Sequence, residues 1–175
     1  MKKSELRTMF LKRRKQLDSR MHAMFNMMLL DRLEDYLENI EAKHVAIFYP
    51  MHNEVDLRAL KHKYTVYLPK IKKGKIVFYA DRGAYKDAPF GTTVPAHDDD
   101  VNLNDIDVVI VPGLVYDLGR YRIGYGKGYY DKLLAEYNQA KVGVCFDLFV
   151  VNDLPIEAHD ERVDVLITDQ RTIKG

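Results

Sequence analysis

Six short apolar runs are spread along this chain, and together they leave few folds open to it. The runs are His44–Tyr49, Thr65–Leu68, Ile76–Tyr79, Asp107–Val111, Val142–Phe146 and Val163–Thr168. Each has the length of a β-strand and is rich in valine, isoleucine, tyrosine or phenylalanine. Several are apolar throughout, which is typical of parallel strands that helices cover on both faces. We therefore predict a central, mostly parallel sheet.

Helices are predicted before and between these strands. Apolar residues follow helical spacing from Ser4 to Leu17, and Asp18 and Ser19 offer an N-cap to a second helix. Asp56–Lys63 and Tyr129–Tyr137 are predicted as helices between strands. This alternation predicts an α/β fold, a three-layer α/β/α sandwich. The length of 175 residues suits a single domain, 1–175, in which residues 1–40 form an N-terminal helical pair packed on the sheet.

The second helix carries a stripe rich in methionine. Its members are Met21, Met24, Phe25, Met28, Arg32, Leu33 and Tyr36. A methionine surface can serve as an adaptable binding face, but core packing is the commoner role, and we predict core packing here.

Charge and composition exclude some classes of partner. The net charge of +1 gives no overall field that would draw the chain to nucleic acid or to a membrane. Residues 1–20 are locally basic, and such a run is either a phosphate-binding surface or, more commonly, a solvated helix face. No run is long enough to span a membrane and no signal peptide is evident, so we expect a cytoplasmic protein. The single cysteine, Cys145, lies in an apolar run and is expected to be buried and not nucleophilic.

The segment from Val111 to Asp131, VPGLVYDLGRYRIGYGKGYYD, carries the clearest chemical signal. It begins at the end of a predicted buried strand and finishes on a predicted helix. The alternate glycines Gly124, Gly126 and Gly128 let backbone N–H groups approach an anion closely, and the following helix adds the positive end of its dipole. We predict that this turn binds a polyphosphate; a flexible loop with incidental glycines is the alternative.

The side chains between these glycines suit a nucleotide. Arg122 and Lys127 can neutralise phosphate charge that backbone groups alone cannot. The rings of Tyr125, Tyr129 and Tyr130 can stack on a flat heterocycle, although at least one of them is expected to pack beneath the loop.

Three carboxylates are candidates for the same rim of the sheet. Asp131 follows the glycines directly, and a carboxylate beside phosphates implies an intervening magnesium ion. Asp160, within HDERVDVLITD, is a second candidate, although a cap or a surface charge is the commoner role. Glu54 follows the first strand through the turn Pro50–Asn53, where it can either bind N–H groups of a heterocycle or cap the helix that begins near Asp56.

These segments resemble a known family. RIGYGKGYYD, with VPGLVYD before it, is similar to the signature of the 5-formyltetrahydrofolate cyclo-ligases, also called methenyltetrahydrofolate synthetases. KSELR near the start, FYPMHNEVD around Glu54 and AHDERVDVLIT near the end fall in the family's order, so the resemblance covers nearly the whole chain. It implies ATP-dependent conversion of 5-formyltetrahydrofolate to 5,10-methenyltetrahydrofolate, with release of ADP and phosphate and assistance from Mg²⁺.

The resemblance also implies roles for individual residues. ATP would be bound by Lys3, Arg7, Arg122, Gly124, Tyr125, Gly126, Lys127, Gly128, Tyr129 and Tyr130. The folate would be bound by Met51, Glu54, Tyr125, Gly126, Lys127, Gly128 and Tyr129. Arg122, Lys127 and Glu54 would serve catalysis, and Asp131 and Asp160 would hold the metal. The formyl oxygen would be phosphorylated by ATP, after which the second folate nitrogen would attack the activated carbon.

The chain departs from the family at one point. Many members carry Glu-Pro in the middle of the chain, where this one has Val94 and Pro95 within the run Phe90–Pro95. We expect this run to shape the substrate pocket without the carboxylate contact.

Two rival interpretations of the function remain. One is another phosphate-ester enzyme, such as a small kinase or a sugar-phosphate isomerase, and the other is a nucleic-acid-binding module that uses the basic first helix. We expect small-molecule substrates, no nucleic acid or membrane partner, and a monomer or weak homodimer.

Overall fold

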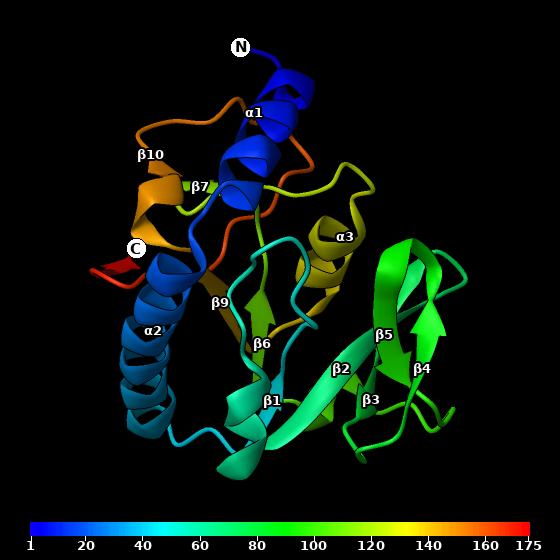
Figure 1. The fold of residues 1–175 in the computed structure, drawn as a ribbon. Coiled ribbons are helices and arrows are strands. Elements are labelled where there is room, and N and C mark those ends of the chain that lie inside the picture. The colour runs from blue at the N-terminus through cyan, green and yellow to red at the C-terminus, as the bar shows by residue number, and fades with distance from the viewer.

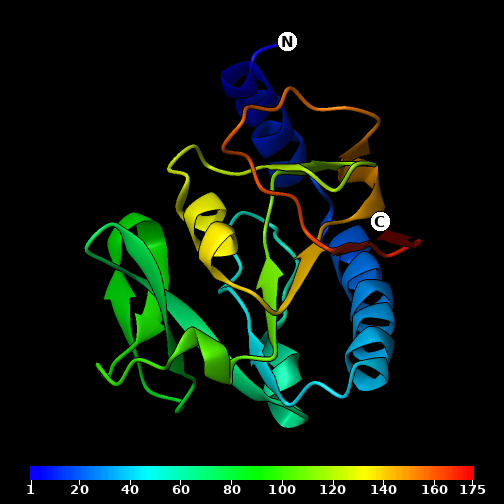
Figure 2. The ribbon, with the colours of Figure 1, turned by 180° about the vertical axis from the view of Figure 1, so that it is seen from behind.

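The computed structural model describes residues 1–175, apart from the side chain of Phe90. The longer helices are α1 (Lys3–Lys15), α2 (Ser19–Asn39) and α3 (Tyr129–Glu136). A sheet forms the middle layer, with α2 on one side and α3 on the other, as Figure 1 and the reverse view in Figure 2 show. The predicted three-layer α/β architecture is therefore confirmed.

The central sheet has seven strands in the described chain, in the order β12-β11-β9-β6-β1-β2-β3. Their bounds are β1 (His44–Ala46), β2 (Thr65–Lys72), β3 (Lys75–Ala80), β6 (Val108–Val111), β9 (Ala140–Val144), β11 (Val165–Ile167) and β12 (Thr172–Lys174). The five inner strands run parallel, while β3 and β12 are antiparallel edges. All six predicted strands are confirmed in this sheet with ends shifted by a few residues, and only β12 was not predicted.

Alternating side chains divide the core between the two faces of the sheet. Odd positions of β1 and even positions of β6, such as Val45 and Val108, pack with Leu33 of α2. Their neighbours Ala46 and Val109 pack with the α3 side chains on the other face. Successive strand residues point to opposite faces, so a strand that is apolar throughout fits only between two covering layers.

The strand order changes direction beside β1. After β1 the chain builds β2 and β3 on one side, and it then crosses to β6 and adds β9, β11 and β12 on the other. The loops that leave the carboxyl ends of β1 and β6 therefore separate at a topological switch point, which is where open α/β sheets bind ligands.

Two smaller sheets extend this core. One is formed by β10 (Val150–Val151), β7 (Val115–Asp117) and β8 (Arg122–Ile123), and the other is the hairpin of β4 (Tyr85–Ala88) and β5 (Thr92–Pro95). The hairpin contains most of the run Phe90–Pro95 that was expected to shape the substrate pocket, although the Phe90 side chain lies outside the described residues. None of the helices in the described residues combines the length and apolar character that a membrane span requires.

The methionine stripe of α2 was wrongly predicted to be core. Met21, Met24 and Met28 are 42%, 48% and 36% exposed. The prediction holds for other members of the stripe, because Leu33 is fully buried and Phe25 and Tyr36 pack against the core. The buried line of α2 is Leu29, Leu33 and Leu37, which repeat every four residues. The sequence predicted the helix and its Asp18 cap correctly, since the Asp18 side chain accepts from the Arg20 N–H.

The helix predicted over Asp56–Lys63 is also wrong in kind. Arg58–His62 forms one short 3-10 turn, η1. The Asp56 carboxylate accepts from the Arg58 backbone N–H, and the chain pairs with β1 again by Thr65. Leu57 and Lys63, which flank the turn, depart from helical geometry and limit it to five residues.

Candidate active site

The first wall of the site is the turn that follows β1. His52 and Asn53 have φ angles of 46° and 61°, a left-handed conformation that asparagine tolerates better than most residues. This turn brings the Glu54 carboxylate back to the Met51 N–H, which donates to Oε1 at 2.9 Å. His22 of α2 donates to the Glu54 carbonyl at 2.8 Å and fixes the backbone there. Of the two roles left open for Glu54, helix capping is therefore excluded, because its carboxylate closes its own turn.

Glu54 is an unusual carboxylate because it is only 6% exposed. Burial raises its pKa from the ordinary value of 4.5 to about 7, although Arg14, the Met51 N–H and Arg122 act to lower it. Only one protein hydrogen bond reaches the carboxylate among the described residues. A carboxylate can accept several more, so Glu54 can receive N–H donors from a ligand.

Arg14 of α1 joins this turn to the loop after β6. Its side chain is buried, and its Nη1 atom donates to the Gly113 carbonyl at 3.3 Å. The same Nη1 lies 3.8 Å from Glu54 Oε2, and Nη2 donates to the Tyr125 hydroxyl. A small cavity between the two loops is lined by Arg14, Glu54, Gly113 and Cys145, among others.

The predicted phosphate loop forms the second wall. Gly126 and Gly128 have φ angles of 96° and 72°, which side chains other than glycine rarely adopt. Gly128 caps α3, so the loop ends on a helix as predicted. Helix α1 lies across this rim (Figure 1), and its Arg7 Nε donates to the Gly124 carbonyl at 3.1 Å. Of the predicted helical pair, α2 lies along the sheet and α1 over the rim loops.

The two basic residues of this loop differ in their surroundings. Arg122 Nε donates to the Pro112 carbonyl at 2.7 Å, and its guanidinium lies over the Tyr130 ring. Lys127 is exposed and has no ion pair or side-chain hydrogen bond within the part of the chain that the structure describes. Both residues can offer charge to an anion, but only Arg122 also supports the loop.

The three tyrosines divide between packing and exposure. Tyr129 and Tyr130 are partly buried against the α3 side of the core, whereas Tyr125 is 45% exposed. The expectation that at least one tyrosine packs beneath the loop is thus confirmed.

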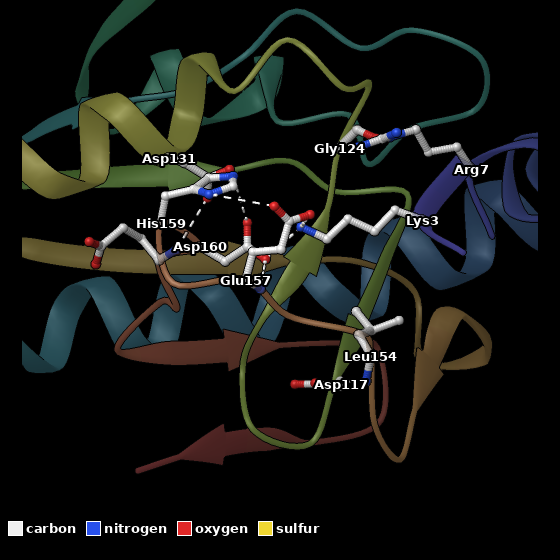
Figure 3. Close-up of polar contacts among 10 residues, drawn as sticks. Lys3, Arg7, Asp117, Gly124, Asp131, Leu154, Glu157, His159 and Asp160 are labelled. Atoms are coloured by element: carbon white, nitrogen blue, oxygen red, sulfur yellow. Dashed lines mark hydrogen bonds and ion pairs between the residues drawn. The ribbon is translucent and has the colours of Figure 1, made fainter. Parts of the chain in front are cut away.

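Lys3, Asp160 and Asp131 lie at the outer end of α1 (Figure 3). Lys3 Nζ lies 2.6 Å from Asp160 Oδ2 and 3.4 Å from Glu157 Oε1. Partial burial would raise the pKa of Asp160, but the hydrogen bonds from Lys3 and the Glu157 N–H outweigh it and hold that pKa below its ordinary value. Asp131 Oδ1 accepts from the Glu161 N–H at 3.3 Å. No group of three or more histidine, cysteine, aspartate or glutamate side chains that could hold a metal occurs among the described residues.

Comparison with known proteins identifies the family. A model of the 5-formyltetrahydrofolate cyclo-ligase family matches residues 1–169. The chain belongs to this family. Among its relatives, a probable 5-formyltetrahydrofolate cyclo-ligase of Schizosaccharomyces pombe is 31% identical over 84 residues, which cover 41% of this chain and 41% of that protein. The cyclo-ligase of Haemophilus influenzae is 26% identical over 147 residues, covering 75% of this chain and 79% of that protein.

Solved structures agree with membership of the cyclo-ligase family. The NMR structure of Aquifex aeolicus 5,10-methenyltetrahydrofolate synthetase has a TM-score of 0.89 at 34% identity, over 99% of this chain and 93% of that chain. A synthetase structure from Mycoplasma pneumoniae has a TM-score of 0.80 at 24% identity, over 97% and 99% of the two chains, and supports the fold. The segment matched in the Schizosaccharomyces pombe relative spans less than half of that protein's length.

Arg14, which contacts residues of both walls of the candidate site, was not singled out by the sequence interpretation. The basic amino terminus was left open between a phosphate-binding surface and a solvated face, and only Lys3 and Arg7 of it were assigned to the site. Lys3, Arg7, Phe10 and Arg14 share one face of α1, at spacings of four, three and four residues. Phe10 and Arg14 of that face are buried. The spacing of the bases with an apolar residue between them was the available signal.

Proposed function

We propose that this chain is a 5-formyltetrahydrofolate cyclo-ligase, which converts 5-formyltetrahydrofolate and ATP into 5,10-methenyltetrahydrofolate, ADP and phosphate. Membership of this family of ATP-dependent ligases supports the reaction. The observation that carries the proposal is the site itself: a buried carboxylate, Glu54, faces a basic glycine loop across the switch point of the sheet. The first is suited to a heterocycle with N–H donors and the second to a polyphosphate.

The nucleotide half of the proposed site is the loop Arg122–Tyr130 with the start of α1. Arg122 and Arg7 each use Nε to hold a backbone carbonyl. Each guanidinium has five N–H donors, so its terminal nitrogens can bind phosphate oxygens. We assign Lys3 and Lys127 to the same phosphates, and Gly124, Tyr125, Gly126, Gly128, Tyr129 and Tyr130 to the surrounding wall.

The folate half of the proposed site is the turn after β1. Glu54 is assigned to the N–H groups of the pterin ring, with Met51 beside it. We assign Tyr125 to both substrates, because its hydroxyl accepts from Arg14 and the residue is 45% exposed. Gly126, Lys127, Gly128 and Tyr129 complete the proposed folate contacts.

The proposed chemistry needs positioning and charge stabilisation but no enzyme nucleophile. A formyl group on nitrogen is a weak electrophile, so its oxygen first takes the γ-phosphoryl group of ATP. The second folate nitrogen then attacks the activated carbon, and the C–O bond breaks to release phosphate. Cys145, the one thiol, is buried, and burial raises its pKa far above neutrality, which suits a packing role. Arg122 and Lys127 would stabilise charge on the transferring phosphoryl group.

Mg²⁺ is proposed as the metal of this reaction. It usually binds through one or two carboxylates together with substrate phosphates and water, and a cage of protein ligands is unusual for it. Asp131 and Asp160 can supply such carboxylates, and the magnesium would neutralise charge on the nucleotide. Asp131→Asn should weaken Mg²⁺ binding, so product formation should need a higher Mg²⁺ concentration, without unfolding of the protein.

Absorbance spectroscopy tests the proposed function, because 5,10-methenyltetrahydrofolate has its own near-ultraviolet band. The band should grow only when ATP, Mg²⁺ and 5-formyltetrahydrofolate are all present, and omission of any one should abolish it. Growth without ATP, or no growth at any protein concentration, would refute the proposal.

We further propose that the enzyme is cytoplasmic and that it is a monomer or weak homodimer. Sedimentation at several protein concentrations would test the oligomeric state.

A further inference from the structure

Arg14 is a buried charge that needs a reason to be there. Its side chain is only 4% exposed, and moving a guanidinium out of water costs several kcal/mol unless partners compensate, by rough estimate. Its Nε has no hydrogen-bond partner among the described residues, so compensation is incomplete. Apolar side chains of similar volume often stabilise a core as well as a buried ion pair does. Folding stability alone is therefore a weak explanation for this arginine.

The partners of Arg14 come from three parts of the site. Gly113 follows β6, Glu54 follows β1, and Tyr125 belongs to the glycine loop. The guanidinium thus spans the switch point between the two strands and touches both the proposed folate wall and the proposed nucleotide wall.

The contact between Arg14 and Glu54 is electrostatic and leaves the hydrogen-bond acceptors of the carboxylate free. The 3.8 Å separation of Arg14 Nη1 and Glu54 Oε2 is within ion-pair distance but too long for a good hydrogen bond. Met51 holds the other carboxylate oxygen. Glu54 is therefore oriented from both sides while lone pairs remain available for a ligand.

From this geometry we infer that Arg14 is a positioning residue, which favours the charged form of Glu54, aims its carboxylate at the folate and links it to the nucleotide loop through Tyr125. The inference rests on the proposed function and assigns a residue to the same site. It predicts that the two substrates bind cooperatively, because ordering of Tyr125 by nucleotide fixes the guanidinium that faces Glu54.

Other groups around Glu54 do not replace Arg14. The titratable groups facing it are Arg122 from β8, Tyr125 and Tyr130 from the glycine loop and α3, His22 from α2 and Cys145 after β9. Arg122 acts on Glu54 less strongly than Arg14, and His22 contacts the carbonyl of Glu54 and not its carboxylate.

The test compares Arg14→Met and Arg14→Lys with Arg13→Met, an exposed charge on the same helix. In Arg14→Met the acid limb of the pH profile of kcat/KM for folate should move up by about one unit or more, because a cation near a carboxylate lowers its pKa by 1–3 units. Arg14→Lys should restore much of that limb, and Arg13→Met should leave it in place. Unchanged limbs in both Arg14 variants would overturn the inference, since a structural brace would lower activity at every pH alike.

A double-mutant cycle that combines Arg14→Met with Glu54→Gln gives a second test of the inference. Once Glu54 is neutral, loss of Arg14 should cost little further activity, so the two effects should be clearly less than additive. Full additivity would contradict the inference. Tyr125→Phe removes only a hydroxyl from a partly exposed residue. It should reduce the enhancement of folate binding by a non-hydrolysable ATP analogue in calorimetry, and an unchanged enhancement would contradict the link.

Failure of the inference is distinguishable from failure of the proposed function. The wild-type protein is assayed first, and absence of product there rejects the proposed function alone. The pKa of Glu54 can then be measured by NMR with ¹³C-labelled glutamate in wild type, Arg14→Met and Arg14→Lys, without turnover. A higher pKa in Arg14→Met that Arg14→Lys reverses supports the inference, and equal values in all three proteins overturn it.

Discussion

Lys3 Nζ lies 2.6 Å from Asp160 Oδ2. These two residues come from opposite ends of the chain, and Figure 3 shows the lysine reaching from α1 to the loop that carries Glu157 and His159. One was assigned to phosphate and the other to metal, so in the protein alone each partners the other. If nucleotide and metal bind as proposed, Lys3 would exchange Asp160 for a phosphate group, and Asp160 would exchange Lys3 for the metal ion.

Lys3→Met should therefore weaken ATP use more than folate use. A charge-assisted hydrogen bond is worth about 1.5–3 kcal/mol, so the KM for ATP should rise by about tenfold or more. Steady-state kinetics with each substrate varied in turn measures this, with the exposed Lys2→Met as the matched control. Equal increases in both KM values would contradict the assignment of Lys3.

Lys127→Ala and Arg122→Ala should separate the binding of ATP from the structural support of the glycine loop. Both should raise the ATP requirement, by about 10- to 100-fold. Only Arg122→Ala should also lower the free energy of unfolding, by about 1 kcal/mol, because its Nε holds the Pro112 carbonyl. Kinetics and urea denaturation on the same preparations check this. If Lys127→Ala raised the folate KM as much as the ATP KM, the nucleotide role of the loop would be wrong.

Gly126→Ala and Gly128→Ala test the backbone of the loop. Both positions have positive φ, so each alanine should cost about 1–2 kcal/mol of stability. At Gly126 an added Cβ would also lie 3.2 Å from the guanidinium carbon of Arg7, whereas at Gly128 it would meet nothing within 4 Å. Gly126→Ala should consequently weaken ATP binding more than Gly128→Ala, as calorimetry can show. Indistinguishable affinities would mean that Arg7 does not serve the nucleotide.

Glu54→Gln should change how stability depends on pH. Burial raises the pKa of Glu54 from 4.5 to about 7, so its contribution to stability is complete below pH 4.5 and is lost as pH rises to about 7. Glutamine does not titrate, so the stability of the variant relative to wild type should improve by about 2–3 kcal/mol across that window. Urea unfolding at a series of pH values measures the difference. Parallel pH profiles would show that Glu54 titrates near its ordinary value.

Leu33→Ala and Met24→Ala test the buried face of α2. Leu33 is fully buried, and its truncation should cost about 2–5 kcal/mol. Met24 is exposed, so its truncation should change stability by less than about 0.5 kcal/mol. Denaturation midpoints decide between this pattern and the one the sequence predicted, in which both would be costly.

The sequence by itself determined the layers of this protein. Runs such as Val108–Val111 are apolar at every position, and only a strand between two covering layers can bury both of its faces. The glycine turn was equally readable, because positive φ at Gly126 and Gly128 is a local requirement. Glu54 was placed on the rim by its distance from the first strand, but its role was left open between ligand and cap.

The tertiary structure alone decided which side chains meet. Helical periodicity marked a stripe on α2, yet Met24 is 48% exposed while Leu33 is fully buried, because the buried line of the helix runs through Leu29, Leu33 and Leu37. Charge marked Arg14 as one base among many, and its contacts with Gly113 and Glu54 join residues 99 and 40 positions away along the chain. Local rules act within a few residues, whereas the partners of a buried charge depend on the order of strands in the sheet.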